Sequence, residues 1–200
     1  MMVSMPGRSA APEGHRIVDF LNTAYLPEGD DALADERATG WLTDWLGTGA
    51  PASTTAGAGD EVLLQRLREV REGLRQFAVA NNGEPPDEET IDRAAVALGS
   101  LDLVLDIGDQ DRGPRMMPSA NAGAVTVTER ALVVLAECYL KARLGENWLR
   151  VKACASADCR YAFLDTSRNR SRRWCEMAYC GNRAKNRAWR QRSVNARPDR

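Results

Sequence analysis

The sequence predicts a mainly α-helical protein, in which a helical N-terminal domain with one β-hairpin precedes a small C-terminal module organised by cysteines. Apolar residues recur at helical spacing in most segments before Gly145, whereas one segment alternates with period two. Four of the five cysteines lie within 27 residues near the C-terminus. With 44% apolar and 28% charged residues, the 200-residue chain has the composition of a folded globular protein.

The N-terminal domain is predicted from a succession of amphipathic segments. Apolar residues recur at helical spacing in residues 15–25 and again in residues 35–46. The clearest helix covers residues 61–80, and its apolar positions recur at steps of four and three: Leu63, Leu67, Val70, Leu74 and Phe77. Residues 47–59 are rich in Gly, Ala, Ser and Thr, so we expect them to form a flexible loop.

A short helix and the hairpin follow. The long helix is expected to end at an Asn-Asn-Gly sequence, and a Pro-Pro-Asp sequence at 85–87 to begin another that reaches about Leu98. Residues 101–107 alternate between leucine or isoleucine and other residues, which predicts a strand. Turn residues at 109–113 allow residues 115–118 to return as a second strand, which its proline confines to an edge.

The last helix of this domain has the strongest start signal. Thr126 is followed three residues later by Glu129, a capping-box pattern, and an apolar run begins directly afterwards. We expect the helix to reach about Leu144 and to be capped by Gly145. Its apolar run is too short to span a membrane, and Cys138 within it is expected to be a small buried hydrophobic residue.

The formal net charge of -1 hides two oppositely charged parts. Residues 1–149 hold 13 Lys and Arg against 24 Asp and Glu, whereas residues 150–200 hold 14 against 4. A basic module of this kind is typical of nucleic-acid binding, although docking on the acidic domain is the alternative interpretation. The first 14 residues lack the apolar block of a secretory signal, so we expect a cytoplasmic protein with no membrane partner.

The clustered cysteines form two pairs with identical spacing, Cys154-x4-Cys159 and Cys175-x4-Cys180. Two loops that each offer a pair of thiolates supply the four tetrahedral ligands that zinc requires. A complete thiolate set leaves no position for a catalytic water, so we expect one structural zinc ion. Disulfides would require an oxidising compartment, and iron–sulfur ligation is a second alternative.

Two groups of cationic residues are candidates for nucleic-acid contact. After Cys180 the sequence has strong helical propensity and places Arg183, Arg187 and Arg190 on one face, with Lys185 roughly opposite. The second group lies in the loop between the cysteine pairs and comprises Arg168, Arg170, Arg172 and Arg173. The guanidinium group of arginine binds phosphate groups and guanine edges through two parallel hydrogen bonds, which favours a nucleic-acid partner.

Not every cation of the module is available to a partner. A zinc ion with four thiolates is formally negative, and we expect some neighbouring cations, Lys152 and Arg160 among the candidates, to compensate it. Trp174, directly before the second cysteine pair, is expected to pack over the zinc core. For Trp189, packing and partner contact are equally open.

Three stretches of the C-terminal module form a long and specific motif. They are Phe-Leu-Asp-Thr-Ser-Arg-Asn from Phe163, Arg-Arg-Trp-Cys-Glu-Met from Arg172, and Cys-Gly-Asn-Arg-Ala-Lys from Cys180. This motif resembles the bacterial CGNR zinc-finger family. The resemblance implies a treble-clef-like hairpin and C-terminal helix around one zinc ion, which the four matching cysteines bind. Arg160-Tyr departs from the Gly-Trp that the family often has, which concerns a local aromatic contact.

A shorter resemblance covers the N-terminal domain. The Asp-Phe-Leu-Asn-Thr sequence from Asp19 and the Trp-Leu pair at Trp41 are similar to the ABATE domain, which precedes this finger in stress-induced transcription regulators. The resemblance implies a mostly α-helical domain and a role in transcription regulation. We therefore expect four parts: a flexible N-terminus (1–14), a helical ABATE-like domain (15–147), a CGNR-type zinc finger (148–193) and a flexible tail (194–200).

The favoured functional hypothesis is a DNA-binding transcription regulator whose helical domain senses an effector or dimerises. Duplex DNA would be its partner, with a small-molecule effector and a second copy of the chain as open candidates. The alternative is a zinc-stabilised module that binds protein or RNA. We do not expect an enzyme, because the only histidine is His15 and a closed metal shell offers no reactive position. Asp19 and Asn22, one helical turn apart, are candidates for a ligand pocket, although capping or solvation is the simpler interpretation.

Overall fold

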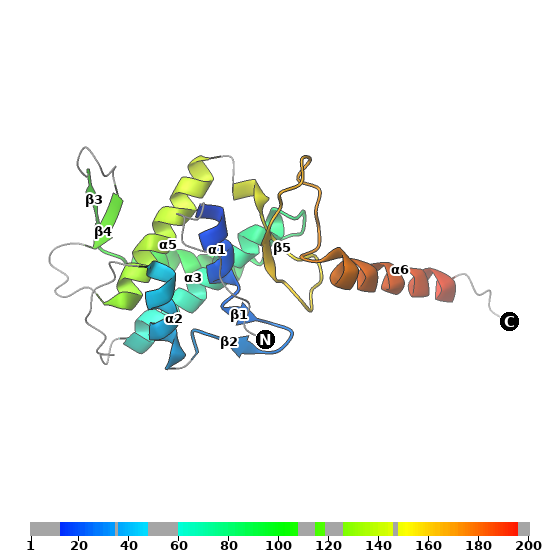
Figure 1. The fold of residues 1–200 in the computed structure, drawn as a ribbon, viewed down its shortest axis with the longest axis horizontal. Helices are drawn as coiled ribbons and strands as arrows, with labels where there is room; N and C mark the ends of the chain where they lie inside the picture. Colours follow the sequence, from blue (N-terminus) through cyan, green and yellow to red (C-terminus); the bar gives the residue numbers. More distant parts are fainter. Residues whose placement is uncertain are drawn as a thin grey trace.

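The computed structural model describes residues 13–34, 36–47, 60–107, 115–118, 126–145 and 148–195. Most of the flexible segments expected at 1–14, 47–59 and 194–200, and the hairpin turn expected at 109–113, lie outside this described part, whereas residues 13–14 and 194–195 are helical. Within it, α-helices dominate and three short antiparallel hairpins accompany them (Figure 1). Among the described helices, none is both long and apolar enough to cross a membrane.

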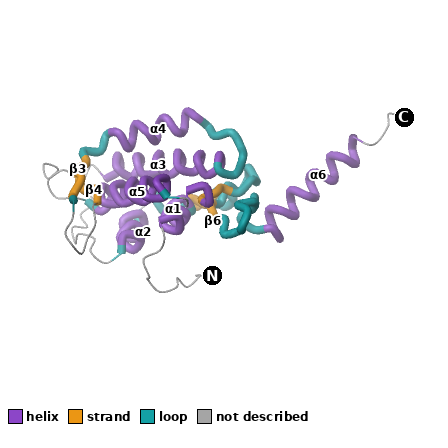
Figure 2. The backbone as a smooth tube through the Cα atoms, turned by 90° about the horizontal axis from the view of Figure 1, so that it is seen from above, coloured by secondary structure: helices purple, strands orange, loops and turns teal. Residues whose placement is uncertain are grey.

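The N-terminal region is a layered helical assembly around its longest helix, α3 (Asp60–Ala80). α4 (Glu88–Gly99) packs along one side of α3, while α1 (Glu13–Leu21) and α5 (Val127–Leu144) pack on the other side (Figure 2). α2 (Arg37–Leu46) lies against α5 in the outermost layer. Because each helix has an apolar stripe at helical spacing, this layering buries every stripe against a neighbour.

The close approach of α3 and α4 depends on one glycine. A Cβ atom added to Gly73 in α3 would stand only 2.2 Å from the Cβ of Ala94 in α4. The absence of a side chain at this position therefore permits the two helices to pack at short distance.

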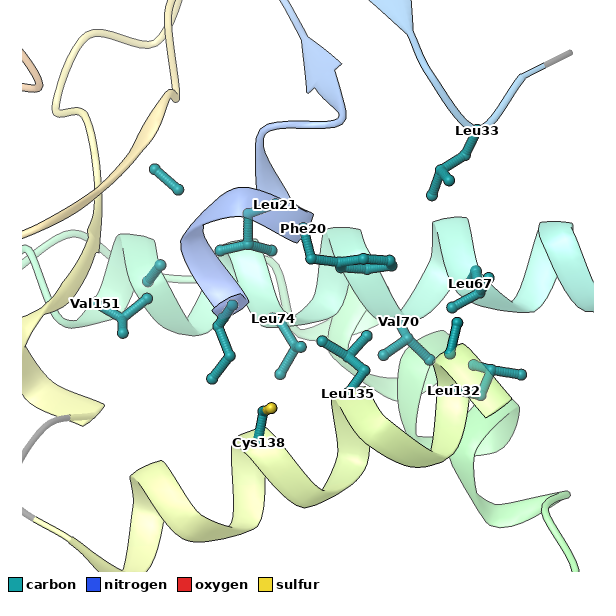
Figure 3. Close-up of a cluster of buried hydrophobic side chains, with 14 of the residues drawn as sticks. Phe20, Leu21, Leu33, Leu67, Val70, Leu74, Leu132, Leu135, Cys138 and Val151 are labelled. Atoms are coloured by element: carbon teal, nitrogen blue, oxygen red, sulfur yellow. The ribbon is translucent and has the colours of Figure 1, made fainter. Parts of the chain in front are cut away.

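The hydrophobic core lies between α1, α3 and α5 (Figure 3). Its largest fully buried apolar residues include Phe20, Leu21, Leu67, Leu132 and Leu135. Cys138 is 6% exposed and belongs to this core, as the sequence predicted. Val151, which lies in the C-terminal module, has no exposed surface and is part of the same cluster. One core therefore extends from the helical region into the cysteine-bearing region.

The start and end signals of α5 are confirmed. The hydroxyl of Thr126 accepts a hydrogen bond from the N–H of Glu129 at 3.1 Å, and the Glu129 carboxylate accepts one from the N–H of Thr126 at 2.9 Å. This reciprocal arrangement is a capping box. The helix ends at Leu144 with Gly145 as its C-cap residue.

The predicted hairpin is also confirmed, since β3 (Leu103–Asp106) pairs with β4 (Arg115–Pro118). A second and shorter pair, β1 (Ala24–Tyr25) with β2 (Asp30–Asp31), was not predicted. The first amphipathic segment was expected to be helical as far as residue 25. Instead, α1 ends at Leu21, and β1 occupies the end of that segment.

A buried arginine from α3 fixes this unpredicted pair. Two nitrogens of Arg71 donate to the two carboxylate oxygens of Asp31 at 2.7 and 2.8 Å, and one of them also donates to the hydroxyl of Thr23 at 3.1 Å. Although burial alone would raise the pKa of Asp31, hydrogen bonds from Arg71 and the N–H of Leu33 hold that pKa below its usual value. A tertiary contact thus stabilises strands that are too short to form by themselves.

Candidate metal centre and basic helix

The first cysteine pair lies at one end of a hairpin. β5 (Val151–Ala153) and β6 (Ala162–Leu164) pair in antiparallel fashion, and Cys154 directly follows β5. In the connecting loop, the N–H of Cys159 donates to the carbonyl of Ser156 at 2.9 Å. This turn closes the loop and returns Cys159 toward Cys154, so that both thiols face the same point.

The second cysteine pair leads into the C-terminal helix. Cys180 lies within a single π-helical turn, Met177–Gly181, and its N–H donates to the carbonyl of Glu176 at 3.0 Å. The turn continues without interruption into α6 (Asn182–Asn195), which ends two residues beyond the expected boundary at 193. The base of α6 is therefore placed by a candidate metal ligand.

Gly181 allows close packing at this junction. A Cβ atom there would stand 2.3 Å from Sδ of Met177 and 3.2 Å from Cδ1 of Trp174. Trp174 in turn packs against the buried cysteines, as the sequence predicted. The glycine of the Cys-Gly-Asn-Arg sequence thus has a steric role beside the cluster.

The four sulfur atoms converge between the two pairs. The ligand atoms of Cys154, Cys159, Cys175 and Cys180 all lie within 4.8 Å of one another. Sγ of Cys175 is 3.7 Å from Sγ of Cys159 and 3.7 Å from Sγ of Cys180, and all four residues are free thiols. Sulfurs bound at about 2.3 Å to a tetrahedral zinc ion are about 3.8 Å apart. The donor set therefore fits zinc in both chemistry and spacing.

Burial and mutual proximity shape the ionisation of these thiols. Burial and the neighbouring sulfurs raise the pKa of Cys180 to about 11 and raise the pKa of Cys175 far above its usual range. At Cys154, burial alone would also raise the pKa, but hydrogen bonds from the N–H groups of Cys175 and Ser156 leave it below the usual value. Four thiolates this close repel one another, so a divalent cation between them is what makes the fully ionised cluster favourable.

A buried ion pair organises the loop between the cysteine pairs. Nζ of Lys152 lies 2.7 Å from the carboxylate of Asp165, and the two side chains are 5% and 0% exposed. The carboxylate also accepts hydrogen bonds from Ser167 and from the N–H of Arg172. Although burial alone would raise the pKa of Asp165, these hydrogen bonds and the Lys152 charge lower it to about 2. Lys152 therefore neutralises Asp165, which differs from the expected compensation of the thiolates.

Arg172 is also engaged within the loop. Its Nε donates to the carbonyl of Trp174 at 2.9 Å, and a terminal nitrogen donates to the carbonyl of Cys175. The guanidinium carbon lies 4.7 Å from the centre of the Phe163 ring. These contacts hold the chain that enters the second cysteine pair.

Polar side chains of the helical region bind the backbone of the C-terminal module. Nδ2 of Asn82, in the turn that follows α3, donates to the carbonyls of Ala153 and Arg173, both at 2.8 Å. The amide of Asn22 donates to the carbonyl of Ala162 at 3.0 Å and accepts from its N–H at 2.8 Å. Asn22 thus binds the edge of β6 as a neighbouring strand would.

Arg75 adds a third connection between the two regions. Its side chain is 2% exposed, and its terminal nitrogens donate to the carbonyls of Arg160 at 3.0 Å and Leu21 at 2.5 Å. Arg160 itself pairs with Glu84 at 2.7 Å. Together, Asn22, Arg75 and Asn82 fix the module on the helical region.

Family comparisons agree with this arrangement. The ABATE model, which is described as "Putative stress-induced transcription regulator", matches residues 14–145. The chain belongs to the ABATE family. The CGNR zinc-finger model matches residues 150–193, which we call the CGNR finger, and the cofactor of the chain is one zinc ion. No curated protein matches the chain.

In this ABATE-family chain, α6 extends away from the helical region (Figures 1 and 2). Its cationic side chains are all exposed: Arg183, Lys185, Arg187, Arg190 and Arg192. Arg187 forms an exposed ion pair with Asp158 at 3.3 Å. The structure thus brings the first predicted group of nucleic-acid contacts together on one helix.

The second predicted group lies on the loop that Asp165 organises. Arg168 and Arg173 are exposed there, and the backbone carbonyls of Arg170 and Arg172 accept hydrogen bonds from Lys152. The loop is therefore held in one conformation beside the zinc cluster.

A groove separates the first cysteine loop from α6. It has a volume of about 230 Å³ and is lined by Ala155, Ser156, Ala157 and Trp174 on one side, and by Ala184, Arg187, Ala188 and Gln191 of α6 on the other. The α6 residues among them define the side of the helix that faces the finger.

The predicted ligand-pocket residues lie at the junction of the two regions. Asp19 is at the exposed face of α1, and partial burial raises the pKa of its carboxyl. Asn22 uses its amide to bind β6, as described above, and the pocket stays a prediction. Sequence reasoning did not assign Arg75 or Asn82 to this junction, since their partners lie 85 and 71 residues away and leave no local signal.

Proposed function

We propose that this ABATE-family protein is a transcription regulator that binds duplex DNA through the CGNR finger and α6. In this proposal Cys154, Cys159, Cys175 and Cys180 hold the zinc ion, which has a structural role. The observation that carries the proposal is α6, an exposed cationic helix whose base is placed by the cysteine cluster.

The electrostatics support a polyanionic partner. Residues 150–200 hold 14 Lys and Arg against 4 Asp and Glu, and five of these cations are exposed on α6. The helix has 14 residues, which gives a length of about 21 Å, comparable to six base-pair steps of duplex DNA. Lys152 is buried with Asp165 and adds no exposed charge, whereas Arg168, Arg172 and Arg173 on the neighbouring loop are exposed and add to the five cations of α6.

The helical region would supply the regulatory part of this function. It is joined to the finger by buried hydrogen bonds of Asn22, Arg75 and Asn82. An effector or a second copy of the chain that binds the helical region would therefore act on the finger through rigid contacts.

The test is a titration of the zinc-loaded protein with duplex DNA and with single-stranded RNA at several salt concentrations. We expect the logarithm of the duplex affinity to fall linearly with the logarithm of salt, because each phosphate contact releases counterions. The double variant Arg183→Ala/Arg190→Ala should reduce this slope by about 2. The matched control Arg66→Ala/Arg93→Ala removes two cations from α3 and α4 and should leave the slope unchanged.

Three results would overturn the proposal: tighter binding of RNA than of the duplex, no binding of either nucleic acid, or an unchanged slope in the α6 variant. A Cys175→Ser variant should lose duplex affinity together with zinc. Persistent binding by this variant would separate the DNA contact from the metal centre.

A further inference from the structure

The sides of α6 carry different chemistry. Successive helical residues are rotated by about 100°, so one side that is fixed by contacts defines all the others. The side toward the first cysteine loop carries Ala184, Ala188 and Gln191, which line the groove with Trp174. This side faces the finger, and its single cation, Arg187, pairs with Asp158 of the first cysteine loop at 3.3 Å.

Cations occupy the two flanks of the helix. Arg183 and Arg190 project from one flank, while Lys185 and Arg192 project from the other, and all four are exposed. The helical rotation places the two flanks roughly opposite each other. A single flat phosphate surface would contact only one of them.

The outer side of α6, opposite the groove, differs from both flanks because its side chains are uncharged. It carries Asn182, Asn186 and Trp189, which are exposed and uncharged. Trp189 is 65% exposed, which is a large apolar surface for a helix that is otherwise polar. Large exposed aromatic residues of this kind mark contact surfaces.

We propose that α6 enters the major groove of duplex DNA and that Asn186 and Trp189 are its base-reading residues. This inference rests on the proposed function and specifies its contact. The major groove admits one α-helix, and phosphate strands form both of its walls while base edges form its floor. The two cationic flanks of α6 match the walls, and its uncharged outer side matches the floor.

The side chains on the outer side also indicate which bases are read. The amide of an asparagine binds both major-groove groups of one adenine: its oxygen accepts a hydrogen bond from the N6 amino group and its nitrogen donates one to N7. The ring of Trp189 offers an apolar surface to the C5-methyl group of thymine. A site that contains A·T pairs beneath the middle of α6 therefore follows from Asn186 and Trp189.

The inference is tested by selection of binding sites from a random duplex pool with the zinc-loaded full chain. The wild-type protein should enrich a site that contains A·T pairs. Asn186→Ala should lower discrimination at one A·T position by about tenfold or more, and Trp189→Ala should lower it at a neighbouring thymine. Lys185→Ala, from a cationic flank, should weaken all sequences equally. Zinc content and far-UV circular dichroism verify that each exposed substitution leaves the fold intact.

The outcomes separate this inference from the proposed function. If both outer-side variants select the wild-type site with unchanged discrimination, or if the wild-type protein binds duplex DNA without sequence preference, the base-reading role is wrong while DNA binding stands. If the wild-type protein binds no duplex, or prefers single-stranded RNA or a protein surface, both are wrong.

Discussion

At the scale of single residues, both the CGNR finger and the helical region contain a buried aspartate that is paired with a buried cation. Asp165 is fully buried with Lys152 beside the zinc cluster, and Asp31 accepts two hydrogen bonds from buried Arg71 in the helical region. A buried pair contributes little net stability relative to apolar residues, but removal of one partner leaves an uncompensated charge. An exposed aspartate lies near each pair in the sequence, and its substitution serves as the control for substitution of the buried one.

The first prediction concerns Asp165. Asp165→Asn should lower the free energy of unfolding of the CGNR finger by about 3 kcal/mol, because it leaves Lys152 buried without a counter-charge. Asp158→Asn, which removes an exposed pair with Arg187, should cost less than about 1 kcal/mol. Thermal unfolding of the zinc-loaded variants, followed by zinc release, measures the difference. Equal costs for the two substitutions would contradict the structural role of Asp165.

The second prediction concerns pH. The folded pKa of Asp31 lies below its usual value of 3.8, so the stability from its pair with Arg71 is present above about pH 4 and is lost as the pH falls further. Asp31→Asn should therefore cost about 2 kcal/mol at pH 7, and its difference from the wild type should shrink at pH 3. Urea unfolding followed by circular dichroism measures both values. Asp30→Asn, at an exposed neighbour, should show little effect at either pH.

At the scale of elements, prediction succeeded where a segment carries its own periodicity or end signal. α3 and α5 were predicted within one residue at their N-termini because their apolar stripes and the Thr126 capping box are local features. β1 and β2 have two residues each, which is too short to show alternation, and they depend on Arg71 from α3. The π-helical turn at Met177–Gly181 was likewise unpredicted, because it follows from packing at the cysteine cluster.

The third prediction concerns the junction between α3 and the finger. Asn82→Asp preserves the shape of the side chain but replaces the donor of two buried hydrogen bonds by an acceptor. It should lower the free energy of unfolding by about 2–3 kcal/mol, since the carbonyls of Ala153 and Arg173 lose their partner. Hydrogen exchange at the start of the finger should accelerate, as mass spectrometry can measure. Unchanged exchange there would show that Asn82 does not hold the finger.

At the scale of the whole molecule, the cysteine spacing was sufficient to predict the zinc site, since ligand identity and spacing are properties of the sequence. The attachment of the site to the helical region was not predictable. Asn22 was interpreted as a ligand-pocket candidate, and its hydrogen-bond partner Ala162 lies 140 residues away. Long-range contacts of this kind depend on the complete fold, which places β5 and β6 against the helical core.

The fourth prediction is that removal of zinc unfolds the second cysteine pair and α6 while the helical region stays folded. Among the residues that the structure describes, Trp174 is the one apolar side chain besides the cysteines that packs against the cysteine cluster, so we expect the metal to supply most of its folding energy. Val151, by contrast, is buried in the main core. A chelator should therefore unfold α6 and the second cysteine pair, so that trypsin cleaves them faster, while cleavage in α3 and β5 stays slow. Simultaneous loss of protection throughout the chain would contradict this division.

α6 is attached at its base to the turn that contains Cys180. Among the described elements it makes its main contacts with the π-helical turn that contains this residue. Over a length of about 21 Å, a tilt of about 10° at its base displaces the far end by about 4 Å, which exceeds the rise of one base pair. In the proposed complex with DNA, the orientation that the cysteine cluster gives to the base of α6 would therefore decide which base pairs its far end reaches.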